Sequence, residues 1–231
     1  MERGFVKLWR KITTSPVFVH SDHELLRVWI FLLTIATFKQ DEAGEGILRG
    51  QVWTSREELQ AKMSPTGGNM LSKKCCWGLL KTLEDMENIS IEECEGVSLV
   101  TITKWEVYQA PDVHSDRGFF KLWRKIVDSD VFAVPEVLKL WIYCLASASY
   151  DDVSIPPNIG SKRPVLLKKG QFIIGREKLR RDLFHRVHKG TPSAVTCWRW
   201  LKRLEDMKAI SIQSSGSYSV VTINNWSAHQ V

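Results

Sequence analysis

Hydrophobic residues recur at helical spacing near the start of the chain. Phe5, Leu8, Trp9 and Ile12 fall at positions i, i+3, i+4 and i+7, which predicts a short amphipathic helix. A longer apolar stripe follows Asp22, whose carboxylate can cap a helix, and this stripe predicts a second helix. Its members are Leu25, Val28, Trp29, Leu32, Leu33 and Ala36.

Apolar alternation and turn residues predict the elements that follow. Residues 51–53 read as a short strand, 55–63 and 72–86 as two helices around a turn rich in Gly, Pro and Ser, and 89–93 with 97–103 as a hairpin. Helix, helix, strand, helix, turn, helix and hairpin is the order of a winged helix-turn-helix. In that fold the second helix of the motif enters the DNA major groove, and the hairpin forms the wing.

The same pattern then returns. RGFVKLWRKI at residues 3–12 is followed by RGFFKLWRKI at 117–126, and the echo continues as far as Trp105 and Trp226. The offset between matching residues drifts from 114 to 121, as small loop insertions would produce. We call the two halves the first and second copies and predict an α+β fold, mainly α, of two tandem winged helix-turn-helix domains. The expected boundaries are 1–108 and 117–231, with a linker at 109–116.

Length and composition fit this organisation. The 231 residues give each copy a common domain size, and 44% hydrophobic with 25% charged residues is typical of a soluble globular protein. The net charge of +6 is divided unevenly. The sequence up to residue 113 carries 13 Lys and Arg against 16 Asp and Glu, a net of −3, and the rest carries 19 against 10, a net of +9. The second copy is therefore the better candidate for binding a polyanion.

Several classes of protein are not expected. No apolar run is long enough to cross a bilayer, and the N-terminus lacks the apolar stretch of a signal peptide, so we predict a cytoplasmic protein without a membrane partner. Five cysteines without paired spacing predict no disulfide framework. A zinc site from His185, His188 and Cys197 is disfavoured because only Cys197 has a counterpart, Cys76. No catalytic or cofactor motif is present, so an enzyme is not expected.

Basic side chains gather on the two helices of the motif in the second copy. The recognition helix is expected to turn Thr196, Arg199, Lys202 and Arg203 outward, and the preceding helix carries Arg176, Lys178, Arg180 and Arg181. Thr191 and Pro192 predict the N-cap and first residue of the recognition helix. Arginine suits guanine edges and phosphates because its planar fork donates two parallel hydrogen bonds. The alternative is that these surfaces are basic merely for solubility.

The predicted DNA contacts also include other positions. These are Thr191, Ser193 and Ser215 in the second copy and Lys73, Lys74 and Lys81 in the first. The first wing contains Glu92, Glu93 and Glu95, which phosphates would repel, whereas the second is neutral and rich in serine. The acidic wing is either an ordinary solvated turn or the mark of a protein-binding or dimerising first copy.

Two further sets of side chains recur in both copies. The basic residues Lys7, Arg10 and Lys11 return as Lys121, Arg124 and Lys125. Their recurrence suggests either contact with the DNA backbone or packing through their apolar stems. The equivalent tryptophan pairs are Trp9/Trp123, Trp29/Trp141, Trp77/Trp198 and Trp105/Trp226. We expect core packing for three pairs. The pair on the recognition helix is left open between packing and base stacking.

The motifs quoted above also carry a family resemblance. The GF-x-KLWRKI opening, the Leu-x-x-Trp helix, the Gly-Gln strand, Arg-Glu-x-Leu, Leu-Lys-x-Leu-Glu-x-Met and the Val-Thr-Ile-x-x-Trp ending occur in both copies. Each copy resembles the N-terminal winged-helix domain of phage replisome organisers and DnaD-like primosome proteins. Such proteins often add a C-terminal helical domain linked to helicase loading. Only five residues follow Trp226, so we do not carry that activity over.

Together these observations predict a non-enzymatic protein that binds double-stranded DNA. The resemblance favours replication initiation or origin binding in a phage or mobile element. Transcriptional regulation is the alternative that uses the same predicted DNA-binding surface. Two recognition helices on one chain can mimic a dimer and read two half-sites without a palindrome. The rival hypothesis is an adaptor of a replication complex, which docks a replication protein or itself through residues 1–108.

Overall fold

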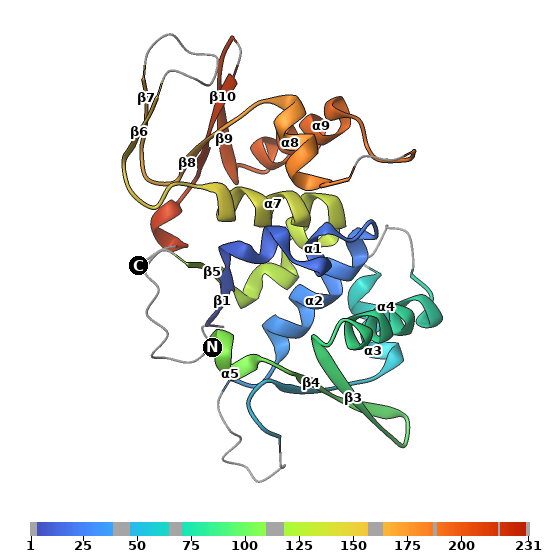
Figure 1. Cartoon of the computed structure of the whole chain (residues 1–231). Coiled ribbons are helices and arrows are strands. Elements are labelled where there is room, and N and C mark those ends of the chain that lie inside the picture. The colour runs from blue at the N-terminus through green and yellow to red at the C-terminus, as the bar shows by residue number, and fades with distance from the viewer. Residues whose placement is uncertain are drawn as a thin grey trace.

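The computed structural model describes most of the chain and shows a mixed α+β protein, with about half of the described residues helical (Figure 1). The described residues are 4–38, 47–64, 71–109, 118–156, 164–186, 189–216 and 218–229. The first copy contains β1 (Phe5–Trp9), a 3-10 helix (Arg10–Thr14), α1 (Pro16–Val19), α2 (His23–Ile35), β2 (Gln51–Thr54), α3 (Arg56–Met63), α4 (Lys73–Asp85), β3 (Ile89–Cys94), β4 (Val97–Ile102) and α5 (Trp105–Gln109).

Among the described residues, the second copy repeats this order and shows one further hairpin. Its elements are β5 (Phe119–Trp123), a 3-10 helix (Arg124–Asp128), α6 (Asp130–Ala133), α7 (Pro135–Ser147), β6 (Val153–Ile155), β7 (Val165–Leu167), β8 (Gln171–Ile174), α8 (Arg176–Leu183), α9 (Ala194–Asp206), β9 (Ile210–Ser215), β10 (Tyr218–Ile223) and a 3-10 helix (Trp226–Ala228). The added hairpin, β6 with β7, belongs to the loop that is longer in the second copy.

The prediction of an opening helix is wrong, because each copy begins with a strand. Val6 and Leu8 are buried, and the residues on either side of them are partly exposed, which is the alternation of a strand. The reason lies outside the local sequence: β1 pairs antiparallel with β5, the equivalent strand of the other copy. Cross-copy backbone bonds outweigh a helical spacing that spans only two turns.

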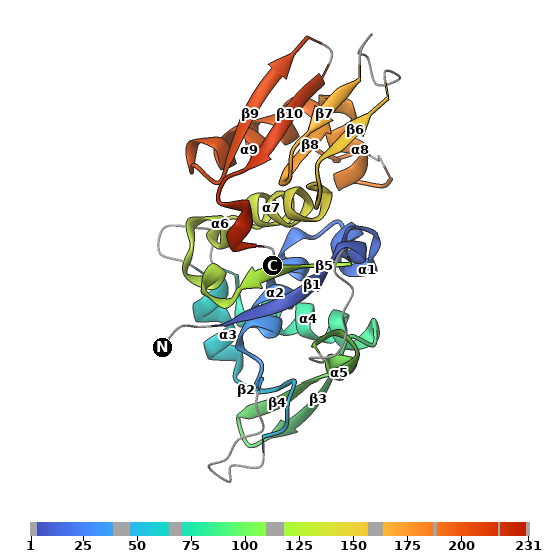
Figure 2. The same cartoon turned by 90° about the vertical axis from the view of Figure 1, so that its left-hand side faces the viewer.

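This strand pairing is symmetric about its centre. Lys7 stands opposite its own equivalent, Lys121, while Phe5 stands opposite Trp123 and Trp9 opposite Phe119. The equivalent helices α2 and α7 also pack against one another, and buried residues of both copies form one hydrophobic cluster. Figure 2 shows β1 and β5 side by side where the two copies meet. The predicted linker begins at Gln109, the last residue of α5, and residues 110–117 lie outside the described part of the chain.

Within each copy a three-stranded sheet follows α2 or α7. The strand orders are β2-β4-β3 and β8-β10-β9, so the two sheets have the same topology. Gly50 and Gly170, both at φ +77°, precede the first strands, and an added Cβ would come within 2.6 Å of Trp105 or Trp226. This close approach explains the repeated Gly-Gln pair and the repeated tryptophan that ends each copy.

The helix after the turn begins later than predicted in the second copy. Ser193, and not Thr191, is the N-cap of α9: its side chain accepts a hydrogen bond from the Thr196 amide. Ser72 caps α4 in the same way through the Cys75 amide. A serine at both positions satisfies a free amide of the first helical turn, which explains why both helices begin where they do.

Candidate nucleic-acid interface

Helices α8 and α9 pack together in the second copy and present a basic outer surface. Cys197, Leu201 and Leu204 bury the inner face of α9, because they recur at helical spacing. Arg199, Lys202 and Arg203 are exposed and Thr196 is half-buried, so the predicted outward residues do share one side of the helix. We call the exposed side chains of α8 and α9 the α8–α9 face.

Most contacts made by the cations on α9 are weak surface contacts. Lys202 Nζ lies 2.7 Å from a Glu205 carboxylate oxygen, with about half of the lysine side chain exposed. Arg199 donates to the Thr196 hydroxyl at 3.3 Å. Exposed ion pairs of this kind contribute about 0–1 kcal/mol, so a phosphate can replace the present partner at little cost.

The four predicted contacts on α8 have different surroundings. Arg176 is exposed, with its guanidinium 5.5 Å from the centre of the Trp198 ring, and Arg181 is also exposed. Arg180 is half-buried and donates from Nε to the Pro192 carbonyl at 3.0 Å, so it holds the turn before α9. Lys178 is exposed but pairs with Asp182, which also accepts from the Tyr143 hydroxyl at 2.6 Å.

The remaining predicted residues of the second copy lie at the edges of this surface. Thr191 is half-buried in the turn, and Ser193 is exposed but occupied with capping α9. Ser215 is exposed at the end of β9, opposite Tyr218. The cations that combine exposure with a shared helix pair are therefore Arg176, Lys178, Arg181, Arg199, Lys202 and Arg203.

In the first copy the equivalent cations are neutralised by carboxylates. Lys81 lies 3.0 Å from Glu84 and 3.6 Å from Glu93, and Arg56 lies 3.7 Å from Glu93. Lys73 Nζ is 2.5 Å from Glu57. Lys74 is exposed at the start of α4.

Glu93 belongs to the hairpin of β3 and β4. Its equivalent in the second copy is Ser214, so the α8–α9 face lacks this carboxylate. One glutamate of the acidic wing, Glu93, thus pairs with the cations of its own copy, and its replacement by Ser214 adds to the difference in charge between the two surfaces.

The tryptophans on the recognition helices serve as supports for arginine. Trp77 and Trp198 are both half-buried against the core, and Arg56 lies 4.3 Å from the Trp77 ring centre. Arg176 takes the same position over Trp198. Of the other pairs, Trp29, Trp141 and Trp105 are buried, while Trp9, Trp123 and Trp226 are half-buried.

The repeated basic motif at the start of each copy joins the two copies through its central arginine. Arg10 donates to the carbonyls of Ala146 and Ala148 at 2.6 and 2.7 Å, at the end of α7. Arg124 donates to the equivalent carbonyls of Thr34 and Ala36, both at 2.9 Å, at the end of α2. Burial lowers the pKa of both guanidinium groups. Sequence reasoning raised a shared role for these arginines but gave no sign that each reaches into the other copy.

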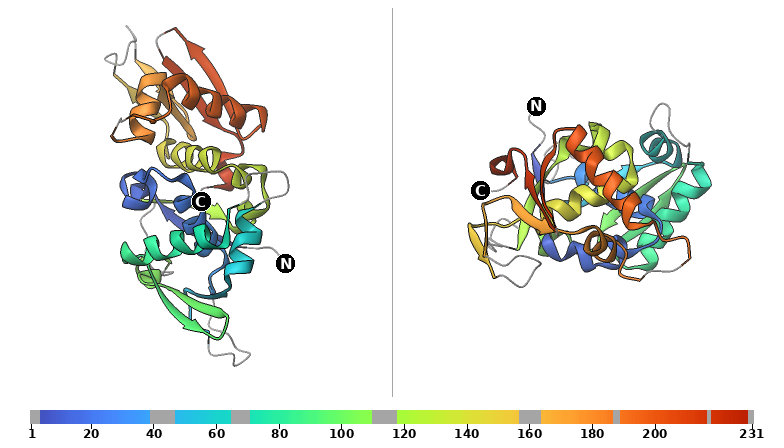
Figure 3. Two further views of the ribbon diagram at one scale, coloured as in Figure 1. Left: turned by 90° about the vertical axis from the view of Figure 1, so that its right-hand side faces the viewer. Right: turned by 90° about the horizontal axis from the view of Figure 1, so that it is seen from above.

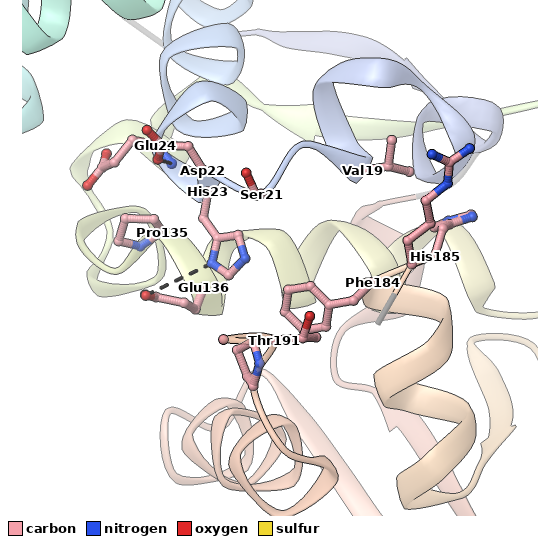
Figure 4. A pocket seen from close by; sticks show the side chains of 13 residues that line it. Val19, Ser21, Asp22, His23, Glu24, Pro135, Glu136, Phe184, His185 and Thr191 are labelled. Atoms are coloured by element: carbon pink, nitrogen blue, oxygen red, sulfur yellow. Dashed lines mark hydrogen bonds and ion pairs between the residues drawn. The ribbon is translucent and has the colours of Figure 1, made fainter. Parts of the chain in front are cut away.

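A cavity of about 690 Å³ lies between the copies, beside the turn that precedes α9. Figure 4 shows His23, from α2 of the first copy, together with three residues of the second copy: Glu136 from α7, Phe184 and Thr191. The His23 ring lies 3.9 Å from the Glu136 carboxylate and 5.5 Å from the Phe184 ring centre. None of these residues stood out in the sequence except Thr191, because their proximity depends on how the two copies pack.

Two buried nitrogens near this cavity have no hydrogen-bond partner among the described residues. They are Nε2 of His23 and Nζ of Lys139, the latter 4.9 Å from the centre of the Phe184 ring. Burial, together with the nearby Lys139 charge, lowers the pKa of His23 to about 4. Burial lowers the pKa of Lys139 to about 8.

Comparisons with protein-family models, with curated proteins and with solved structures gave no match to this chain. The five cysteines are free. Within the described ranges, no three His, Cys, Asp or Glu side chains are grouped so as to hold a metal ion, and His188 lies outside those ranges. No helix in the described part of the chain combines the length and apolar character needed to cross a membrane.

Proposed function

We propose that the chain is a non-enzymatic protein that binds double-stranded DNA, with each copy acting as a winged helix-turn-helix. The observation that carries the proposal is the α8–α9 face: six exposed cations on two packed helices, next to a hairpin without carboxylates. Arginine and lysine on such a surface can neutralise phosphates, and α9 is the helix that would enter the major groove.

The biological role is proposed from the family resemblance. Replication initiation or origin binding in a phage or mobile element is the first choice, and transcriptional regulation is the alternative with the same chemistry. Footprinting on the DNA that encodes the protein separates them. Protection inside a replication gene supports origin binding, and protection overlapping a promoter supports regulation.

A matched pair of charge reversals tests the DNA interface. In fluorescence anisotropy with duplex DNA, the full chain should bind with an affinity that falls steeply as salt rises. Arg199→Glu with Lys202→Glu should weaken binding by at least about 30-fold and flatten the salt dependence. Lys81→Glu with Thr82→Glu, changed on the equivalent helix α4, should have a much smaller effect. Equal losses in both variants, or none in the first, would show that the α8–α9 face is not the binding surface.

A second candidate function is protein docking by the first copy. The observation that favours it is the exposure of Trp53 and Val97, at 39% and 44%, on the sheet that also carries Glu92 and Glu93. The register places Trp53, Val97 and Glu92 on one face of the sheet, and Glu93 on the other. Exposed apolar side chains beside a charged one are typical of a protein interface. Trp53→Ser should abolish a stable complex with a replication protein without changing DNA affinity. If it changed DNA affinity instead, the docking role would be wrong.

A further inference from the structure

The contacts between the copies come in symmetric pairs. The Arg10 amide donates to the Gly118 carbonyl at 2.8 Å, and the Arg124 amide donates to Gly4 at 3.0 Å. Lys7 lies over the Phe119 ring at 5.1 Å, and Lys121 lies over the Phe5 ring at 4.7 Å. With the symmetric register of β1 and β5, these pairs mean that a two-fold rotation, not a translation along the chain, relates the copies.

This rotation fixes where the two candidate recognition helices lie. In the left view of Figure 3, α4 and α9 both lie on the side facing the viewer, one in each copy, with α7 and α1 between them. Strands β1 and β5 lie toward the opposite side, which faces the viewer in Figure 2. One face of the molecule therefore presents both helices.

The arrangement is held by more than the strand pair. Helices α2 and α7 pack together in a shared core. Arg10 and Arg124, which we call the arginine clamps, each bind the C-terminal end of the other copy's helix. Arg27 adds a bond from α2 to the Ala133 carbonyl at 3.3 Å. A buried, hydrogen-bonded junction of this kind fixes the relative orientation of α4 and α9 before any ligand binds.

We propose that the DNA target is bipartite, with two unequal half-sites in inverted orientation on one side of the duplex. This inference rests on the proposed function. A two-fold axis between two recognition helices matches the local two-fold axis of DNA, as it does in homodimeric repressors, and this requires inverted half-sites. A spacing of about one helical turn, roughly 10 base pairs, brings both half-sites to the same side.

The half-sites are unequal because the two helices differ in charge. The α8–α9 face offers exposed arginines for base and phosphate contacts, and it specifies the stronger half-site. In the first copy Lys81 and Arg56 share Glu93, whereas Lys73 has one exposed partner, Glu57, which a phosphate can displace at little cost. Lys73 and the exposed Lys74, near the start of α4, therefore supply the second contact. That half-site is contacted by fewer cations and contributes less affinity than the stronger one.

The test uses the full chain and duplexes built around the stronger and the weaker half-site, both found by selection from a random library. Three probes carry the stronger half-site alone, with the weaker one inverted, or with the weaker one in direct repeat, and the centre-to-centre spacing is scanned from about 8 to 14 base pairs. The inverted probe should bind at least about 10-fold more tightly than the other two at its best spacing. Hydroxyl-radical footprints should show two protected segments on one side of the duplex.

A double variant tests whether the first copy contacts the weaker half-site. Lys73→Glu with Lys74→Glu should reduce affinity for the inverted probe to that of the single half-site, and remove the corresponding protected segment. Lys104→Glu, an exposed charge reversal in the same copy at the start of α5, is the matched control, and thermal unfolding checks that both variants fold. Equal binding of inverted and direct probes, or protection of one segment only, overturns the bipartite inference while DNA binding stands. Failure to bind any duplex above nonspecific background overturns the proposed function itself.

Discussion

At the scale of single residues, the two copies bury a cation at the same position but surround it differently. Arg27 and Lys139 occupy equivalent positions on α2 and α7, and each is only 2% exposed. Arg27 is fully engaged: it lies 2.6 Å from Glu24 and donates to the Met63 carbonyl at 2.5 Å. Lys139 Nζ has no hydrogen-bond partner within the described ranges, and the ring centres of Phe18 and Phe184 lie 5.1 and 4.9 Å from it. Removing one partner of a buried ion pair destabilises the fold because the other charge is left uncompensated, whereas a buried charge without a partner is itself destabilising.

Replacing each cation with methionine should therefore have opposite effects. Arg27→Met should lower the free energy of unfolding by about 3 to 5 kcal/mol, because it leaves Glu24 and a carbonyl without their donor. Lys139→Met should raise it by about 3 kcal/mol at neutral pH, because it removes the cost that lowers the lysine pKa from 10.5 to about 8. Urea unfolding of both variants measures this. A loss of stability in Lys139→Met would mean that its ammonium has a stabilising role.

His23 should make stability depend on pH in a definite window. Its pKa of about 4 in the folded chain lies below the ordinary value of 6.5. Between these values the unfolded chain binds a proton that the folded chain does not, so the free energy of unfolding falls as pH drops from 6.5 toward 4. The loss should reach about 3 kcal/mol and then level off. His23→Gln should remove this part of the pH profile in urea titrations, and an unchanged profile would exclude His23 as its source.

At the scale of elements, the sequence predicts best where structure depends on local signals. The amphipathic stripe of α2, the capped helix α4 and the hairpin of β3 and β4 all follow from spacing and turn residues. The opening segment does not. Its apolar residues fit a helix, but β1 forms because an equivalent strand lies more than one hundred residues away in the chain.

The candidate site likewise has features that the sequence predicts and features that only the packed structure shows. Comparing the two copies of the repeat was enough to find the basic residues of α8 and α9, because their outward direction follows from helical spacing. The pairing of Glu93 with Lys81 and Arg56, and the use of Arg180 to hold the turn, need the packed positions of separate elements. Periodicity carries no information about such contacts.

The arginine clamps at the helix ends should be major contributors to the junction. Arg124→Ala leaves the carbonyls of Thr34 and Ala36 without a charged donor, and it should lower the free energy of unfolding by about 2 to 3 kcal/mol. Lys125→Ala, at the exposed neighbouring position, should change it by less than about 0.5 kcal/mol. Comparable losses in the two variants, measured by urea unfolding, would mean that the clamp adds little.

At the scale of the whole molecule, the duplication reproduces the interface of a two-fold dimer within one chain. The strand pair, the α2–α7 contact and both clamps run between the copies, and the hydrophobic cluster is continuous across them. One copy alone would leave a strand edge and an apolar helix face exposed. We therefore expect the two copies to unfold together, in one cooperative transition.

A cut between the copies tests this expectation. A protease site inserted within residues 110–117 allows the chain to be cleaved after folding, and the two fragments should remain together as one species in size-exclusion chromatography at micromolar concentration. The junction, not the covalent connection, holds them, so cleavage should lower the unfolding midpoint only through the added freedom of the separated ends. Adding Arg10→Glu and Arg124→Glu to the cleavable chain should release the fragments, because each introduced carboxylate would face helix-end carbonyls. If the fragments separate without these substitutions, or if the uncut chain shows two resolved unfolding transitions, the copies are independent domains. The fixed geometry of α4 and α9 would then be lost as well.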